Sequence, residues 1–130
     1  MKQVILIRKD LKMRRGKEIA QGSHASMAFI AEQLRAALGV DAGAAELPVL
    51  LNPTERAWLL AGAAKVCLRV ESEAALLDYH RRAVDAGLVS HLIRDSGRTE
   101  FGGVPTLTAC AIGPDDASLI DTITSELVPY

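Results

Sequence analysis

The segment from Arg94 to Pro105 gathers side chains that could hydrolyse an ester. Asp95 offers a carboxylate that can orient or deprotonate water, and Ser96, Thr99 and Thr106 offer hydroxyls. Such donors can stabilise the oxyanion that forms when water attacks a carbonyl. The alternative is a simple turn in which Asp95 bonds the backbone ahead of it. A loop of about 12 residues is long for a small domain, however, and long ordered loops are often functional.

A second polar set has helical spacing. Lys17, Gln21 and His24 follow an i, i+4, i+7 pattern and share one side of the helix predicted over residues 17–38. The opposite side carries Ile19, Ser23, Met27, Ile30 and Leu34, which makes the predicted helix two-faced. The alanines that flank the polar stripe (Ala20, Ala25 and Ala28) permit the close approach of another backbone or a ligand. Each polar residue alone is equally consistent with an ordinary helix surface.

Charge is concentrated in one segment. The chain carries 15 Lys and Arg against 16 Asp and Glu, and a formal net charge of −1 argues at first against a nucleic-acid partner. Residues 8–17 (RKDLKMRRGK), however, hold six basic residues and one acidic residue, a net charge of +5, and the remainder carries −6. This basic loop lies between the first strand and the first helix, where backbone N–H groups also favour anions. A solvated surface loop is the alternative, because basic clusters of this size are weak motifs.

Length and composition place the chain among single globular domains. It has 130 residues, of which 49% are hydrophobic and 24% charged, and this argues against long disorder. Aromatic residues make up 4%, too few to predict an aromatic platform for single-stranded nucleic acid. Two cysteines, Cys67 and Cys110, each lie in an apolar run and are predicted to be buried thiols in a reducing compartment. The apolar stretch at the N-terminus is too short for a signal peptide or a membrane span, so we expect a cytoplasmic protein without membrane contact.

The predicted elements alternate between strands and helices. Strands are expected over residues 3–8, 65–70, 89–93 and 106–112, and helices over 17–38, from Asn52 to about 62, from Ser72 to about 86, and over 115–127. Gly39 should end the first helix, and Gly113-Pro114 should break the chain before the last one. The order β-α-α-β-α-β-β-α predicts an α/β fold, a single-domain three-layer sandwich over a mixed four-stranded sheet. Residues 1–130 are expected to form this one domain, with a loop insertion at 39–57. The three histidines lie on different elements, so no metal site is predicted.

Three stretches in order resemble the signatures of one family. VILIRKDLKMRRGKEIAQGSHASMA, LIRDSGRTE and TLTACAIGP are similar to those of the class II (archaeal and eukaryotic-type) peptidyl-tRNA hydrolases. The resemblance covers most of the chain outside residues 39–62. It implies one α/β domain, often dimeric, that cleaves the ester between a peptide and the 3′-terminal ribose of tRNA without a metal ion or other cofactor, and so recycles tRNA from aborted translation.

The resemblance also implies roles for individual residues. Lys17, His24, Asp95 and Thr99 match the catalytic positions of the family's motifs, and either Asp95 or His24 is the general base. Gln21 matches a substrate-orienting glutamine. Thr106 or Thr108 matches a threonine ahead of the final strand, and Thr106 is preferred because it lies nearer the loop. The remaining positively charged residues expected to bind the tRNA backbone are Lys12, Arg14, Arg15, Arg94 and Arg98.

Two other functions remain open from the sequence. A relative of this family could keep the fold as a binding module without turnover, or it could hydrolyse another small acyl ester in a pocket remodelled by residues 39–57. Fold resemblance does not by itself establish activity.

Overall fold

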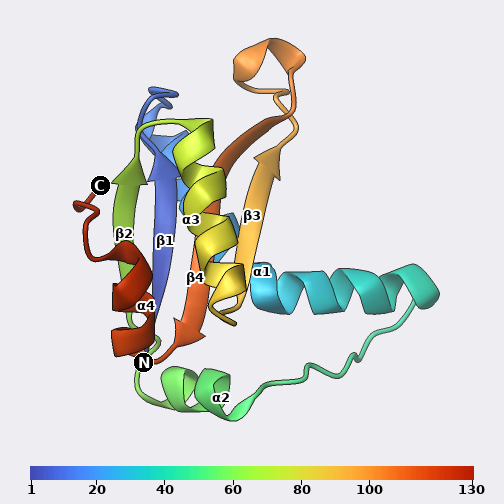
Figure 1. Cartoon of the computed structure of the whole chain (residues 1–130). Helices are drawn as coiled ribbons and strands as arrows, with labels where there is room; N and C mark the ends of the chain where they lie inside the picture. The colour runs from blue at the N-terminus through green and yellow to red at the C-terminus, as the bar shows by residue number, and fades with distance from the viewer.

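A computed structural model describes all 130 residues and shows a mixed four-stranded sheet in the order β2-β1-β4-β3 (Figure 1). Strand β1 pairs in parallel with β2 and antiparallel with β4, which in turn pairs antiparallel with β3. The predicted α/β class, the mixed sheet and the order of elements are confirmed. The strands are β1 (Lys2–Arg8), β2 (Lys65–Val70), β3 (Ser90–Asp95) and β4 (Thr106–Asp115), and the helices are α1 (Arg15–Val40), α2 (Pro53–Leu60), α3 (Glu73–Asp85) and α4 (Ala117–Thr124).

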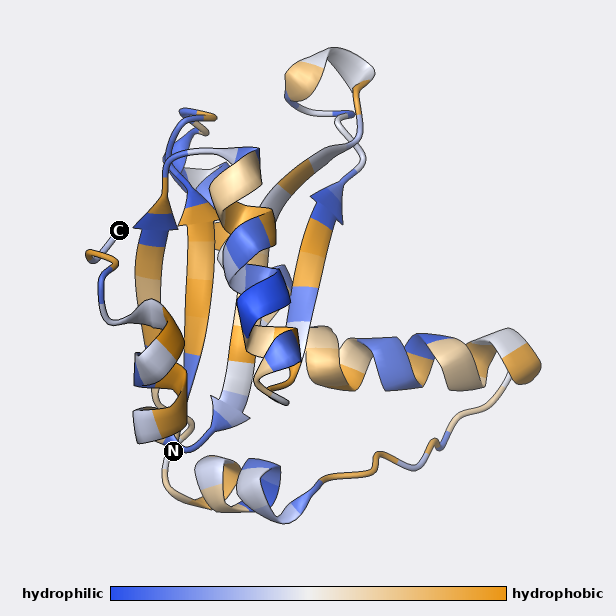
Figure 2. Cartoon of the chain, in the orientation of Figure 1, coloured by the Kyte–Doolittle hydropathy of each residue, from blue (hydrophilic) through white to orange (hydrophobic).

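Helices cover both faces of the sheet. One core joins the side chains of Val4, Leu6 and Cys110 to those of α3 and α4, including Leu76 and Ile120. The smaller core on the opposite face joins β1 and β4 to α1. Because strands covered on both faces need apolar side chains on both, β1 is almost continuously hydrophobic, as the colouring of the central strands shows (Figure 2).

Helix α1 lies on the sheet with its small and polar side rather than its large apolar side. Its buried residues are Gln21, Ala25, Ala28 and Phe29. Ile19 and Met27, on the side that the sequence pattern identified as apolar, are 64% and 59% exposed. An amphipathic helix ordinarily turns its apolar stripe to the core. Here the alanines allow the helix backbone to approach the sheet closely, and this carries Gln21 into the interface.

Helix α1 continues past its predicted end, so the expectation that Gly39 ends it was wrong. The helix reaches Val40 and projects beyond the sheet (Figure 1). Residues 41–52 contain no helix or strand and lead back to α2, which begins with the expected Asn52 cap and a capping box to Glu55. Trp58 of α2 then packs edge-on against Phe29 of α1, with ring centroids 6.0 Å apart. The expectation of a loop over 39–57 was wrong at both ends, because residues 39–40 belong to α1 and residues 53–57 to α2. That this part of the chain is an insertion stays a prediction.

Strand β4 runs through Gly113-Pro114, where the sequence predicted a break. Its register against β1 shifts between the pairs Lys2–Asp115 and Val4–Ile112, and this bulge accommodates the proline. Strand β3 stops pairing at Ile112, so Pro114 has a strand partner on one side only. Helix α4 consequently starts late, after the Asp116 cap, and is shorter than predicted.

The two cysteines differ in exposure. Cys110 is buried as predicted, whereas the prediction for Cys67 was wrong: it is exposed, because it lines a cavity that it shares with α1 residues. None of the helices has a hydrophobic stretch that could cross a lipid bilayer.

Replacing Ala25 with leucine tests the close approach of α1. Ala25 is fully buried among Ile5, Ile7 and Ala109, so the larger side chain should lower the free energy of unfolding by ~1–3 kcal/mol. Urea denaturation measures the change. Ala36→Leu, on the exposed projecting part of α1, is the matched control and should have little effect. Equal stabilities for the two variants would show that α1 does not depend on small residues at this contact.

Candidate functional site

An ion pair joins the first turn of α1 to the end of β3. The Lys17 Nζ atom lies 2.7 Å from Asp95 Oδ1, and the two side chains are only 14% and 12% exposed. The Lys17 ammonium also donates to Thr99 Oγ1 at 2.8 Å. Residues far apart in the sequence therefore meet at one point, next to the loop that follows β3.

Asp95 is held as a carboxylate by donors on both oxygens. Lys17 and the Gln21 amide, at 3.3 Å, donate to Oδ1, and the Gly97 backbone N–H donates to Oδ2 at 2.8 Å. Hydrogen bonding from Lys17 is the largest cause that lowers the pKa of Asp95, with smaller contributions from Gly97 and Gln21, and burial opposes them. Asp95 is thus a stable anion with few free acceptor positions.

Gln21 links this ion pair to the sheet. Its side chain is 1% exposed, and its Oε1 accepts a hydrogen bond from the fully buried Thr108 hydroxyl. Its Nε2 donates to Asp95. A buried amide must satisfy both its donor and its acceptor, so these two contacts fix the rotation of α1 on the sheet.

Thr108 reaches Gln21 because β4 has a bulge at this residue. Ile93 pairs with Ala109 and Arg94 pairs with Leu107, so Thr108 is the extra residue between them. Bulges near active sites commonly redirect one side chain. Thr106 lies nearer the loop in the sequence, but its hydroxyl donates to the Val104 carbonyl at 2.8 Å and does not reach Gln21. Regular two-residue alternation gives no sign of the bulge, so only the strand register distinguishes the two threonines.

Gly97 is required by the shape of the loop. Its φ is +80°, and a Cβ atom there would lie 2.3 Å from the Val104 carbonyl oxygen. The loop therefore folds tightly on itself, which leaves the Gly97 N–H facing Asp95. Glu100 in the same loop accepts a hydrogen bond from Arg14 at 2.8 Å and so ties the loop to the basic segment.

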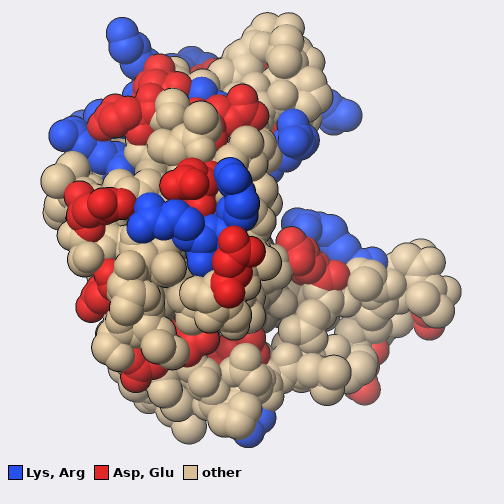
Figure 3. Space-filling model, viewed as in Figure 1, with Lys and Arg blue, Asp and Glu red and all other residues tan.

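A polar cavity of about 390 Å³ opens beside this network, between α1 and β3. Figure 3 shows the molecule hollowed at this place, between the loop after β3 and the projecting part of α1, with Lys and Arg atoms at both edges. The lining residues from α1 are Gln21, His24, Ala28, Glu32 and Arg35, and those from β3 and its loop are Leu92, Ile93, Arg94, Asp95 and Ser96. The size suits a small part of a larger ligand.

The structure thus brings four of the predicted residues into direct contact: Lys17, Gln21, Asp95 and Thr99. His24 and Arg94 line the adjoining cavity. The other predicted residues lie outside the network, with Lys12, Arg14, Arg15 and Arg98 on the surface and Thr106 turned to its own loop. No group of three or more His, Cys, Asp or Glu side chains is arranged to bind a metal ion.

Comparison with known proteins identifies the family. The model of the family described as "Peptidyl-tRNA hydrolase PTH2" matches residues 1–130. The chain belongs to this family. Proteins named peptidyl-tRNA hydrolase from Aeropyrum pernix and Methanocaldococcus jannaschii are 41% and 39% identical to it, over 97% and 98% of this chain and 93% and 97% of their own lengths. A "probable peptidyl-tRNA hydrolase 2" from Dictyostelium discoideum is 34% identical over 99% of this chain and 54% of its own length.

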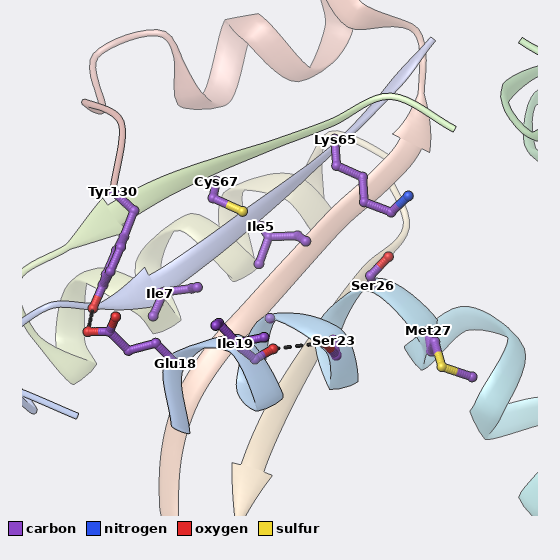
Figure 4. Close-up of a pocket in the computed structure, with 11 residues that line it drawn as sticks. Ile5, Ile7, Glu18, Ile19, Ser23, Ser26, Met27, Lys65, Cys67 and Tyr130 are labelled. Atoms are coloured by element: carbon purple, nitrogen blue, oxygen red, sulfur yellow. Dashed lines mark hydrogen bonds between the residues drawn. The ribbon is translucent and has the colours of Figure 1, made fainter. Parts of the chain in front are cut away.

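This PTH2-family chain has a second, larger cavity of about 570 Å³ on the other flank of α1 (Figure 4). It is mainly apolar, with Ile5, Ile7 and Cys67 on the sheet side and Ile19 and Met27 on the helix side. At one end the Tyr130 hydroxyl donates to Glu18. Neither Lys17 nor Asp95 lines it, so the larger cavity is separate from the ion pair.

The lowered pKa of Asp95 predicts a pH-dependent contribution to stability. A carboxylate whose pKa is lower in the folded state stabilises the protein above its ordinary value of 3.8, and this stabilisation is lost as the pH falls through the folded value. The difference in free energy of unfolding between wild type and Asp95→Asn should therefore be constant near neutrality and shrink in acid below about pH 3.8.

Denaturant titrations from pH 7 to pH 2.5 measure this difference. Asp85→Asn, at an exposed carboxylate outside the salt bridges, is the matched control. A difference that is already lost between pH 7 and pH 5 would contradict the assignment of Asp95 as a strongly held anion.

Proposed function

We propose that this protein is a peptidyl-tRNA hydrolase, which cleaves the ester between a peptide and the 3′-terminal ribose of tRNA and returns the tRNA from aborted translation. The observation that carries the proposal is the Lys17–Asp95 ion pair, with Thr99 on the same ammonium, at the edge of a polar cavity. Family membership over the whole chain supports it.

Ester hydrolysis at this site needs a water molecule and a stabilised oxyanion. The water oxygen attacks the ester carbonyl carbon, and the negative charge that develops on the carbonyl oxygen is stabilised by the Lys17 ammonium, with Thr99 orienting the ester. The bond from the carbonyl carbon to the ribose oxygen then breaks. The attacking water loses a proton, the ribose oxygen gains one, and the products are a free peptide acid and tRNA.

Asp95 is poorly suited to act as the general base. The efficiency of a general base is greatest when its pKa lies near the working pH, and the lowered pKa of Asp95 makes it a weak base. Both of its oxygens are also occupied by donors. In our proposal Asp95 therefore holds Lys17 in place, while His24, exposed on the cavity wall, relays the proton.

Exposed basic residues bind the tRNA backbone in this proposal. Lys12, Arg15 and Arg98 are exposed near the Lys17 end of α1 or in the loop after β3, and Arg94 lines the cavity. Arg14 binds tRNA in this proposal and also holds the loop after β3 through its ion pair with Glu100. Gln21 orients substrate indirectly, through Asp95, and Thr106 supports the loop from Val104. The reaction uses side chains alone, with no metal ion or cofactor.

We extend the proposal to assembly and location. Ile19 and Met27 expose apolar surface beside the larger cavity, which favours a homodimer that covers this face. A substrate made during translation places the protein in the cytoplasm.

Lys17→Met tests the proposed activity directly. In single-turnover hydrolysis of an N-acetylated aminoacyl-tRNA, wild type should release the acyl group and the variant should be ~10²–10³-fold slower, as when an oxyanion donor is removed. Arg81→Met, at an exposed basic residue outside the network and both cavities, is the matched control and should retain its rate.

The outcomes separate the possible functions. Wild type that binds the aminoacyl-tRNA without releasing the acyl group would identify a binding module, and release from small esters alone would identify a different hydrolase. Either result would refute the proposal. Circular dichroism of Lys17→Met establishes that a slower rate does not reflect unfolding.

A further inference from the structure

Around the polar cavity, the acidic side chains have nitrogen partners and the two arginines have no carboxylate partner. Glu32 Oε2 lies 2.9 Å from His91 Nδ1, and Asp95 is paired with Lys17. Arg35 and Arg94 have no carboxylate within 4.0 Å. The Asp95 carboxylate is neutralised by Lys17, whereas Glu32 contacts only an imidazole, so two unpaired guanidinium groups face one carboxylate without a lysine or arginine partner. The lining therefore carries an excess of positive charge, which attracts an anion.

Arg35 has a position that the sequence analysis did not single out. It lies 14 residues beyond Gln21, which corresponds to about 21 Å along the helix axis. It is exposed on the projecting part of α1, yet it lines the same cavity as Asp95. Helical side chains lean toward the N-terminus of their helix, which agrees with the place of Arg35 on the wall of this cavity.

The shape of the molecule makes this part of α1 one wall of a groove. Strand β3 and Ser96 of its loop form the other wall. Basic side chains stand at both edges of the hollow, and acidic side chains lie beside them on the α1 edge (Figure 3). A groove that begins at Asp95 and extends along α1 is longer than a single nucleotide, so its far end meets a part of the substrate beyond the terminal nucleoside, either the peptide or the nucleotides upstream of the ester.

We propose that Arg35 is a specificity-determining residue that binds a phosphate of the single-stranded 3′ end of tRNA, upstream of the terminal nucleotide. The inference rests on the proposed function. Guanidinium groups bind phosphate through two parallel hydrogen bonds, and an unpaired arginine needs no rearrangement of ion pairs to do so. The peptide of the substrate varies in sequence, whereas the phosphates are present in every substrate. A fixed cation such as Arg35 therefore suits a phosphate better than it suits the peptide.

Three acylated substrates test the assignment of Arg35. N-acetyl-aminoacyl-tRNA and the same group on a CCA trinucleotide both contain upstream phosphates, whereas N-acetyl-aminoacyl-adenosine has none. For Arg35→Gln, KM should rise about five- to tenfold with the first two substrates and by much less with the third, while kcat changes little. The slope of log affinity against log salt concentration should also fall by ~0.7.

Arg81→Gln is the matched control. Arg81 is exposed on α3, across the sheet from α1, and lies outside the salt bridges and the cavity. It should leave the KM for all three substrates unchanged. An unchanged KM for tRNA in Arg35→Gln, or an equal loss on the adenosine ester, would overturn the proposal.

The experiment separates this inference from the proposed function. Turnover by wild type tests the function alone. If wild type turns over none of the three substrates, fluorescence anisotropy with deacylated tRNA still decides on Arg35, because weaker binding by Arg35→Gln than by Arg81→Gln supports the contact and equal binding refutes it.

Discussion

The ion pair between Lys17 and Asp95 is the constraint on which the rest of the site depends. Both side chains are largely removed from water, and a charge in such a place is costly unless it is paired and fully hydrogen-bonded. The surroundings meet this requirement with donors from Gln21 and the Gly97 backbone and an acceptor from Thr99. The pair therefore determines where α1 lies on the sheet and how the loop after β3 must fold.

Several features of the fold that look irregular follow from this requirement. The two-faced α1 presents small residues to the sheet, because only a close approach brings Gln21 to both Asp95 and Thr108. The bulge in β4 supplies Thr108 at the right depth. The consequence of the close approach is that Ile19 and Met27 remain on the outer surface, next to an apolar cavity.

Sequence reasoning predicted the strands, the mixed sheet and four of the residues in contact, because these depend on local composition and on short motifs. It could not show that Thr108 rather than Thr106 contacts Gln21, since a one-residue bulge depends on pairing with β3. It also did not foresee that α1 buries Gln21 rather than Ile19, because periodicity identifies two faces and only the partners on the sheet decide between them. Arg35 was missed because its significance lies in the cavity it shares with Asp95, 60 residues away in the sequence.

A double-mutant cycle on the ion pair tests the central claim that Asp95 acts through Lys17. The kcat/KM of wild type, Lys17→Met, Asp95→Asn and the double variant would be measured on one N-acetylated aminoacyl-tRNA. We predict that adding Asp95→Asn to Lys17→Met costs little further activity, because the lysine that Asp95 positions is already absent. The contrary result is a double variant that is slower than Lys17→Met by the full factor that Asp95→Asn causes alone. Such independent losses would show that Asp95 has a role of its own and would contradict this account.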